Sequence, residues 1–201
     1  MSYGLPHTTE VNRALPKKAL YSKFGLKSAV RDRFDADISR LVITHEISPQ
    51  SVPALAEGEI STIYVLSVLL KRKDFDKKNI EQLTKLIPQH MVIALQFEQE
   101  TMLAIFNERL FFADWQPTDT VTIPLNGLTL DAVWQSLVTA IGDFTLQEGN
   151  SLTEQILADE QQEKLLKQIE LLEAKMRKEK QPRRKLELHQ EIIKLKQINY
   201  G

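Results

Sequence analysis

The sequence of 201 residues contains no cysteine. This absence excludes disulfide bridges, thiolate metal sites and a cysteine nucleophile. The chain also has no apolar run that approaches the ~20 residues of a membrane-spanning helix. Its first residues, Met1 to Pro6, show neither the basic region nor the apolar stretch of a signal peptide. We therefore expect a cytoplasmic protein without contact to a membrane.

Motifs that would hold a cofactor or a metal are missing as well. There is no glycine-rich phosphate loop and no Gly-x-Ser-x-Gly nucleophile elbow. The histidines are scattered along the chain and do not form a paired-ligand pattern: His7, His45, His90 and His189. We predict no catalytic residue, no metal site and no bound cofactor.

An excess of basic charge is also lacking, since the formal net charge is -1. Any contact with nucleic acid must then come from local patches of charge. By contrast, 42% of the residues are apolar, which is enough for the core of one domain. The length of the chain leaves room for that domain and an appendage.

The best-specified part of this core is a strand–helix–strand unit from Ile60 to Phe97. The runs Ile60–Leu70 and Met91–Phe97 are short, apolar and bounded by charged or turn residues, which is typical of buried strands. Between the runs lies a helical pattern of apolar residues: Ile80, Leu83 and Ile87. Asp76 can cap this helix, and Pro88 prevents it from continuing.

Further elements lie on either side of this unit. Residues 1–27 resemble an extended arm that ends in a short basic element and docks through three side chains: Tyr21, Phe24 and Leu26. The pattern predicts helices over Ser28–Arg40 and Leu130–Ile141. It also predicts four more strands: Leu41–Ile47, Met102–Phe106, Arg109–Trp115 and Thr120–Ile123. This order predicts an α+β core domain over residues 1–148, with a mainly antiparallel sheet and packed helices.

The composition changes near Gly149, and residues 151–199 form a tail dense in Glu, Gln, Lys and Leu. Seven apolar residues follow the spacing of a coiled-coil seam: Leu165, Ile169, Leu172, Met176, Leu188, Ile192 and Leu195. A proline inside a helix costs about 3 kcal/mol, so Pro182 is better placed as the first residue of a second helix. This predicts a helical hairpin, with a kinked single rod or coiled coil as the alternative. The seam would pack on the domain, on a partner or on a second copy in a homo-oligomer.

Two clusters of basic residues are candidate contacts to nucleic acid. The first follows the central strand and forms either a rim for phosphates or a solvated loop: Lys71, Arg72, Lys73, Lys77 and Lys78. The second surrounds Pro182 and contains one acid, Glu179, among seven cations: Lys175, Arg177, Lys178, Lys180, Arg183, Arg184 and Lys185. In a hairpin the second cluster lies at the tip, where it either neutralises phosphates, with a steep dependence on salt, or only promotes solubility.

A metal-dependent nuclease of the restriction type is the alternative from a different class. Such enzymes bring an acid on one strand to an Asp/Glu-x-Lys motif on its neighbour, because the metal needs converging carboxylates. Here the central strand ends with Leu69-Leu70-Lys71, so the lysine is present and a leucine occupies the position of the acid. Three acids near this strand would serve only if the fold brought them to the lysine: Glu46, Glu57 and Glu59.

Several stretches resemble one bacterial family, the domain of unknown function 4391. One is the N-terminal pattern Gly4-Leu5-Pro6 with Thr9, Val11-Asn12 and Leu15-Pro16-Lys17. Another is the strand ending in Leu70-Lys71-Arg72-Lys73, followed by a helix into Ile87-Pro88. The tail is similar through Ile169–Glu173, Arg177–Gln181 and Arg184–Leu188. The chain departs from the family pattern at the acid in the central strand and at the aromatic residue in the position of Pro182.

The resemblance implies a setting but no reaction. Proteins of this family tend to be encoded beside DNA methyltransferases and Swi/Snf-type helicases in restriction or phage-defence loci. The chain is accordingly expected to be a non-enzymatic accessory subunit of a bacterial DNA-targeting system. It would dock on a helicase or methyltransferase subunit and contact DNA through its basic patches.

Overall fold

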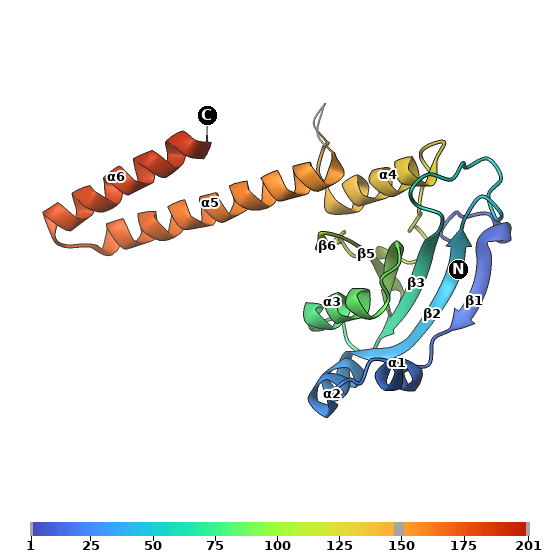
Figure 1. Ribbon diagram of the computed structural model, residues 1–201. Coiled ribbons are helices and arrows are strands. Elements are labelled where there is room, and N and C mark those ends of the chain that lie inside the picture. The colour runs from blue at the N-terminus through green and yellow to red at the C-terminus, as the bar shows by residue number, and fades with distance from the viewer. Residues whose placement is uncertain (1, 147–150, 200–201) are drawn as a thin grey trace. The chain divides into compact units, whose positions relative to one another are not determined.

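The computed structural model describes residues 2–146 and 151–199 and divides the chain into two compact units, Met1–Thr145 and Leu146–Gly201. Figure 1 shows the elements of both units. The predicted boundary between residues 148 and 151 coincides with residues 147–150 and lies outside the described residues. The first unit combines a sheet with helices and the second consists of two helices, which confirms the predicted fold class.

One sheet organises the N-terminal unit. Its strands follow the order β1-β2-β3-β4-β5-β6, and β7 pairs with β5. The strands are β1 (Glu10–Ala14), β2 (Ile38–Ile47), β3 (Ile63–Leu70), β4 (Met91–Phe97), β5 (Glu100–Asn107), β6 (Arg109–Phe112) and β7 (Gln116–Pro117). Each pair is antiparallel except β3 with β4. These two are parallel because the helix between them returns the chain to the edge from which β3 starts.

The strand–helix–strand unit has the predicted construction. Its helix α3 (Lys77–Leu86) begins after Asp76, whose carboxylate accepts a hydrogen bond of 2.9 Å from the backbone N–H of Lys78. The buried face of α3 includes Ile80 and Leu83, which are fully covered. β4 has the predicted bounds, whereas β3 begins at Ile63 rather than Ile60.

Helices lie on both faces of the sheet. α1 (Lys17–Lys23), α2 (Ser28–Asp37) and α3 pack on one face through a core cluster that includes Tyr21, Phe34, Ile80 and Leu83. α4 (Leu130–Gly142) lies on the other face, where Leu137 and Ile141 are beside Thr101 and Leu103 of β5. These two β5 side chains alternate with Met102, which belongs to the first cluster, and therefore point the opposite way.

The N-terminal segment differs from the predicted extended arm. It contains a short 3-10 helix η1 (His7–Thr9), the edge strand β1 and α1. Tyr21 is buried as predicted and Leu26 packs partly on the core, but Phe24 remains 37% exposed and does not dock. The arm is thus part of the sheet rather than an addition to it.

Two other boundaries were predicted wrongly. The helix expected over Ser28–Arg40 ends at Asp37, because Ile38 adopts an extended backbone and pairs with Leu70 at the start of β2. Of the strands expected over Arg109–Trp115 and Thr120–Ile123, only Arg109–Phe112 forms as β6, and the second range is not a strand. Ile123 is nevertheless buried, so its apolar pattern reflects a loop packed on the core.

The C-terminal unit is a helical hairpin, as predicted. α5 (Leu152–Lys178) begins with a capping box between Ser151 and Glu154, and α6 (Pro182–Asn199) has Pro182 as its first residue. At 1.5 Å per residue the helices are about 40 Å and 27 Å long. None of the described helices is both long enough and apolar enough to cross a membrane.

Candidate nucleic-acid interface

The turn between α5 and α6 is stabilised by one carboxylate. α5 ends at Lys178, and Oε1 of Glu179 accepts hydrogen bonds from the backbone N–H groups of Lys180 and Gln181 at 2.8 and 2.9 Å. The N–H groups of Gln181 and Lys180, together with the charge of Arg184, hold the pKa of Glu179 below its usual value. The one acid within the basic cluster therefore serves the turn itself.

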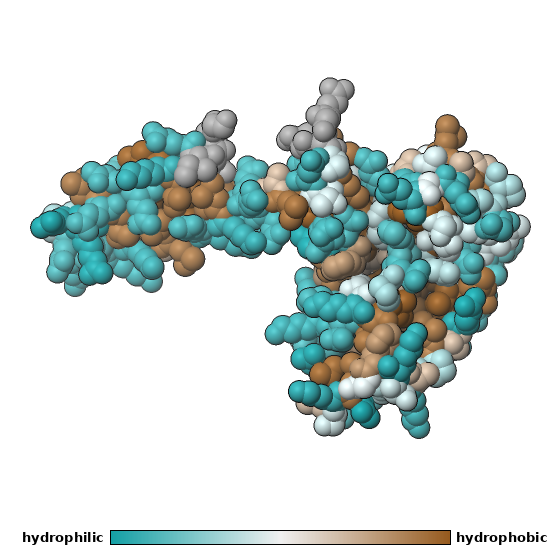
Figure 2. All heavy atoms as spheres, viewed as in Figure 1, coloured by the Kyte–Doolittle hydropathy of each residue, from teal (hydrophilic) through white to brown (hydrophobic). Residues whose placement is uncertain are grey.

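Seven cations surround this turn, and we refer to them as the basic tip: Lys175, Arg177, Lys178, Lys180, Arg183, Arg184 and Lys185. All seven are exposed, and the side chain of Arg183 is 94% accessible. Figure 2 shows the surface around the turn as mostly hydrophilic. The structure thus brings the second predicted cluster together over two helix ends and a three-residue connection.

Only part of this charge is compensated within the hairpin. Arg177 lies 3.8 Å from Glu173, Arg183 lies 3.5 Å from Glu187, and Arg184 lies 4.0 Å from Glu179. These are long, exposed pairs of the kind that contribute little to stability. Among the described residues the four lysines of the tip form no ion pair. The tip therefore keeps positive charge that an external anion can use.

A groove lies beside the basic tip, where α5 faces α6. Its volume is ≈ 550 Å³, and its walls combine apolar, basic and acidic residues: Leu172, Lys175, Lys178, Glu179, Arg184, Leu188 and Glu191. Three of the seven tip cations border it. The groove gives the charged surface a concave part.

The predicted seam forms the interior of the hairpin. Ile169, Leu172 and Ile192 are buried, and four further seam residues pack partly against them: Leu165, Met176, Leu188 and Leu195. Outside the seam, an ion pair of 2.8 Å joins Lys196 of α6 to Glu173 of α5. The hydrogen bond and the charge of Lys196 lower the pKa of Glu173. The seam residues thus contact each other within one chain.

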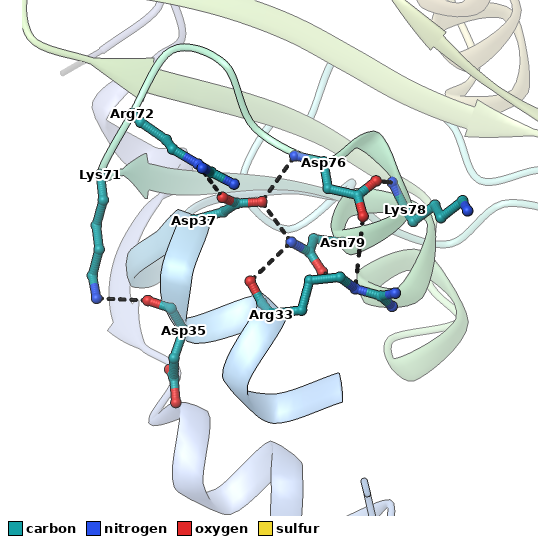
Figure 3. A network of polar contacts seen from close by, with 8 residues as sticks. All are labelled: Arg33, Asp35, Asp37, Lys71, Arg72, Asp76, Lys78 and Asn79. Atoms are coloured by element: carbon teal, nitrogen blue, oxygen red, sulfur yellow. Dashed lines mark hydrogen bonds and ion pairs between the residues drawn. The ribbon is translucent and has the colours of Figure 1, made fainter. Parts of the chain in front are cut away.

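The other predicted basic cluster is tied into the N-terminal unit. Figure 3 shows Arg72 and Asn79 on either side of the buried carboxylate of Asp37. Nε of Arg72 donates to it at 2.6 Å, Nδ2 of Asn79 at 2.7 Å and the backbone N–H of Asp76 at 2.8 Å. This carboxylate joins the end of α2 to the segment that leads into α3. The charge of Arg72 therefore supports the fold, although its side chain is 57% accessible.

The electrostatics of Asp37 reflect these contacts. Burial opposes ionisation of the carboxyl, but the hydrogen bonds from Asp76, Arg72 and Asn79 outweigh it, and the pKa of Asp37 lies below its usual value. A buried charge with three donors is stable only while all three remain in place. The sequence contains no signal for this role, since Asp37 reads as one more polar residue of an exposed helix face.

Lys71 contacts the chain at Asp35 and lies far from Glu46. Its Nζ donates to the backbone oxygen of Asp35 at 2.6 Å (Figure 3). Glu46 pairs with Tyr64 of β3, and Tyr64 lies seven residues before Lys71. At 3.3 Å per residue of strand, Glu46 and Lys71 are therefore roughly 23 Å apart. Among the described residues no group of three or more Asp, Glu or His side chains is placed to hold a metal ion.

Lys73 and the nearby Lys77 lie over aromatic rings, which the sequence did not indicate. Nζ of Lys73 is 5.1 Å from the ring centroid of Trp115 and also pairs with Glu100. Nζ of Lys77 is 4.7 Å from the ring centroid of Phe112. Such distances are typical of cation–π contacts. The pairs join residues far apart in the sequence, so only the fold reveals them.

Two of the histidines, His45 and His90, lie beside aromatic rings of the N-terminal unit. His45 is buried on β2 at 5.8 Å between its ring centroid and that of Tyr3, and neither ring nitrogen has a hydrogen-bond partner among the described residues. His90 stands edge-on to Trp134 at 4.8 Å. Burial lowers the pKa of both, so both are neutral at pH 7. Among the described residues neither belongs to a group of three or more His, Asp or Glu side chains that could hold a metal ion.

Comparison with known proteins adds a family and no activity. A family model described as "Domain of unknown function (DUF4391)" matches residues 3–198, nearly the whole chain. No curated protein and no solved structure matches the chain.

Proposed function

The chain belongs to the domain of unknown function 4391 family, and we propose that it is a non-enzymatic accessory subunit of a bacterial DNA-targeting defence or restriction system. Its basic tip contacts DNA, and its hairpin docks on a larger subunit, a helicase or a DNA methyltransferase. The expected genomic setting of the family, beside genes for such enzymes, supports the choice of partner. The observation that carries the DNA contact is the concentration of seven exposed cations around one helical turn.

The physical argument for DNA rests on local charge. The overall net charge of -1 gives no general attraction to a polyanion. Residues 175–185 nevertheless hold seven cations and one acid, gathered around one turn between two helices. Cations this close act together on a phosphate backbone and release its counterions on binding. The contact reads no base sequence, which suits a subunit whose partner supplies the specificity.

The docking role is supported by apolar side chains that the hairpin leaves outside its seam. Leu186 and Ile193 are 58% and 42% exposed, and they lie seven residues apart on the same side of α6. Leu171 of α5 is 63% exposed. These three side chains do not belong to the seam that holds α5 and α6 together. We therefore assign them to a contact with the larger subunit.

The DNA contact is tested by reversing three charges of the tip. The variant Arg183→Glu, Arg184→Glu, Lys185→Glu should bind duplex DNA at least tenfold more weakly than the wild type at low salt. Its plot of log affinity against log salt should flatten by about 0.9 for each phosphate that the variant no longer neutralises. Fluorescence anisotropy with a labelled duplex across a salt titration measures both quantities.

A matched control reverses three cations of the same hairpin outside the tip: Lys164→Glu, Lys167→Glu and Lys194→Glu. The net charge changes by the same amount, and Lys164 and Lys167 already pair with Glu160 and Glu163 at 2.7 and 2.9 Å. This variant should keep most of the affinity and the salt slope. Equal losses in both variants, or unchanged binding in the tip variant, would remove the DNA role and leave assembly alone.

A further inference from the structure

A second surface of the N-terminal unit combines aromatic rings with cations. Phe112 lies at the end of β6, opposite Ala104 of β5, and Trp115 follows three residues later. Both rings are half-buried and pack against the core from the α3 side of the sheet. Phe75 flanks Phe112 at 6.4 Å between ring centroids. The rings are therefore held in place by the core while part of each remains accessible.

A lysine lies over each of these half-buried rings. Lys77 covers Phe112 and Lys73 covers Trp115, with the ammonium groups 4.7 and 5.1 Å from the ring centroids. Both lysine residues are exposed and lie four residues apart, Lys73 in the loop before α3 and Lys77 at its first position, so their ammonium groups can swing away without disturbing the core. Lys77 forms no ion pair within the described residues, whereas Lys73 shares its charge with Glu100. A planar ligand can enter where the ammonium group now rests.

We propose that Phe112, Trp115, Lys73 and Lys77 form a binding surface for single-stranded DNA, and we call these four residues the stacking surface. Bases would stack on the two rings, and the two displaced ammonium groups would pair with the phosphates that follow. The combination of rings and cations matches single-stranded DNA, because this ligand carries planar bases and phosphate anions in alternation along one chain. Duplex DNA cannot bind in this way, since its bases are stacked on one another.

This inference rests on the proposed function only in taking DNA as the ligand, and it assigns a separate site. The basic tip offers charge without aromatic rings among residues 175–185. The stacking surface offers rings with few unpaired charges. A DNA-targeting system that opens a duplex produces both kinds of ligand, duplex and single strand.

The test compares a labelled 12-nucleotide oligo(dT) with an abasic strand of the same length. Wild-type protein should bind oligo(dT) at least tenfold more tightly, because the abasic strand has the phosphates but no bases to stack. Trp115→Leu and Phe112→Leu keep an apolar side chain against the core and should each lower the affinity for oligo(dT) about tenfold. Binding should also quench tryptophan emission in the wild type and not in Trp115→Leu, because Trp134 is buried.

A second variant avoids the core entirely. Lys73→Gln with Lys77→Gln should weaken oligo(dT) binding without altering the folded state. The matched control is Lys18→Gln with Lys23→Gln, because these two exposed lysines of α1 remove the same charge elsewhere in the unit. The control should bind as the wild type does.

The outcomes separate the two proposals. Equal affinity for oligo(dT) and the abasic strand would overturn the stacking surface, as would a control that loses as much affinity as the lysine variant. If duplex binding still depends on the basic tip in that case, only the stacking surface fails. If the protein binds neither duplex nor single strand, both proposals fail.

Discussion

At the scale of single residues, Asp37 has the most consequential contacts. Its side chain is 1% accessible, yet it carries a charge and accepts three hydrogen bonds from residues 72–79, between the end of β3 and the first turn of α3. Replacing such an anion by a neutral group removes the charge-assisted bonds and turns one acceptor into a donor that faces Asp76 N–H or Arg72. The junction of α2, β2 and the approach to α3 thus depends on one carboxylate.

We expect Asp37→Asn to lower the free energy of unfolding at pH 7 by about 2 to 4 kcal/mol. The pKa of Asp37 is depressed in the folded state, so its stabilisation is complete above the unfolded pKa of about 3.9 and is lost as the pH falls through the lower folded value. The difference between wild type and variant should therefore shrink at pH 3. Urea denaturation at both pH values measures it.

The control for this prediction is Asp32→Asn, on an exposed position of the same helix α2. It should change the unfolding free energy by no more than about 0.5 kcal/mol. A decrease as large as that of Asp37→Asn would mean that helix charge, rather than the buried contacts, sets the stability.

At the scale of elements, the hairpin of α5 and α6 shows how little core a helix pair can have. Three residues are buried along its seam, at 4% to 8% exposure: Ile169, Leu172 and Ile192. Isolated helices of this length are marginal in water, and packing of the seam supplies most of their stability. The capping box at Ser151 and the bonds of Glu179 support the two ends of α5. Each seam residue consequently matters more than in a large core.

We expect Ile169→Ala to destabilise the hairpin by about 2 kcal/mol, the low end for large-to-small changes because the site is shallow. Amide hydrogen exchange in α5 and α6 should accelerate about thirtyfold, while the N-terminal unit keeps its protection, since each unit has its own core. Leu171→Ala is the matched control two residues away, at 63% exposure. It should leave exchange nearly unchanged, and an equal effect would contradict the seam assignment.

At the scale of the whole molecule, the chain joins an α+β unit to a charged helical hairpin, each with its own hydrophobic cluster. The cations are concentrated locally while the total charge stays near zero. Such a distribution favours contact at chosen surfaces over general adhesion to polyanions.

We expect Leu186→Glu with Ile193→Glu to abolish capture of the larger subunit in a pull-down from the native host. Both residues are exposed, so the fold should persist, and Leu128→Glu is the control because Leu128 is 81% exposed in the other unit. Light scattering of the purified chain should give the mass of a monomer for wild type and variant. A wild-type dimer that the variant abolishes would instead identify a second copy as the occupant of this face.

Much of the fold could be predicted because its core segments carry local patterns. The β3–α3–β4 unit and the hairpin at Pro182 combine apolar periodicity with capping or breaking residues, which act over a few positions. β1 carries no such pattern, since all five of its residues are exposed and it is held by backbone hydrogen bonds to β2. The end of α2 was missed for a related reason: Ile38 fits a helical period and a strand equally well, and pairing with Leu70 decides.

The candidate site likewise has one part that the sequence predicted and another part that only the structure revealed. The basic tip follows from composition together with one proline, because the cations are neighbours along the chain and a hairpin needs only a local turn to gather them. The engagement of Arg72 with Asp37, and of Lys73 and Lys77 with Trp115 and Phe112, joins residues about 35 to 42 positions apart. Periodicity reports which residues share a face of one element. Only the packing of elements on each other decides which charge meets a buried partner, which lies over a ring and which remains available to a ligand.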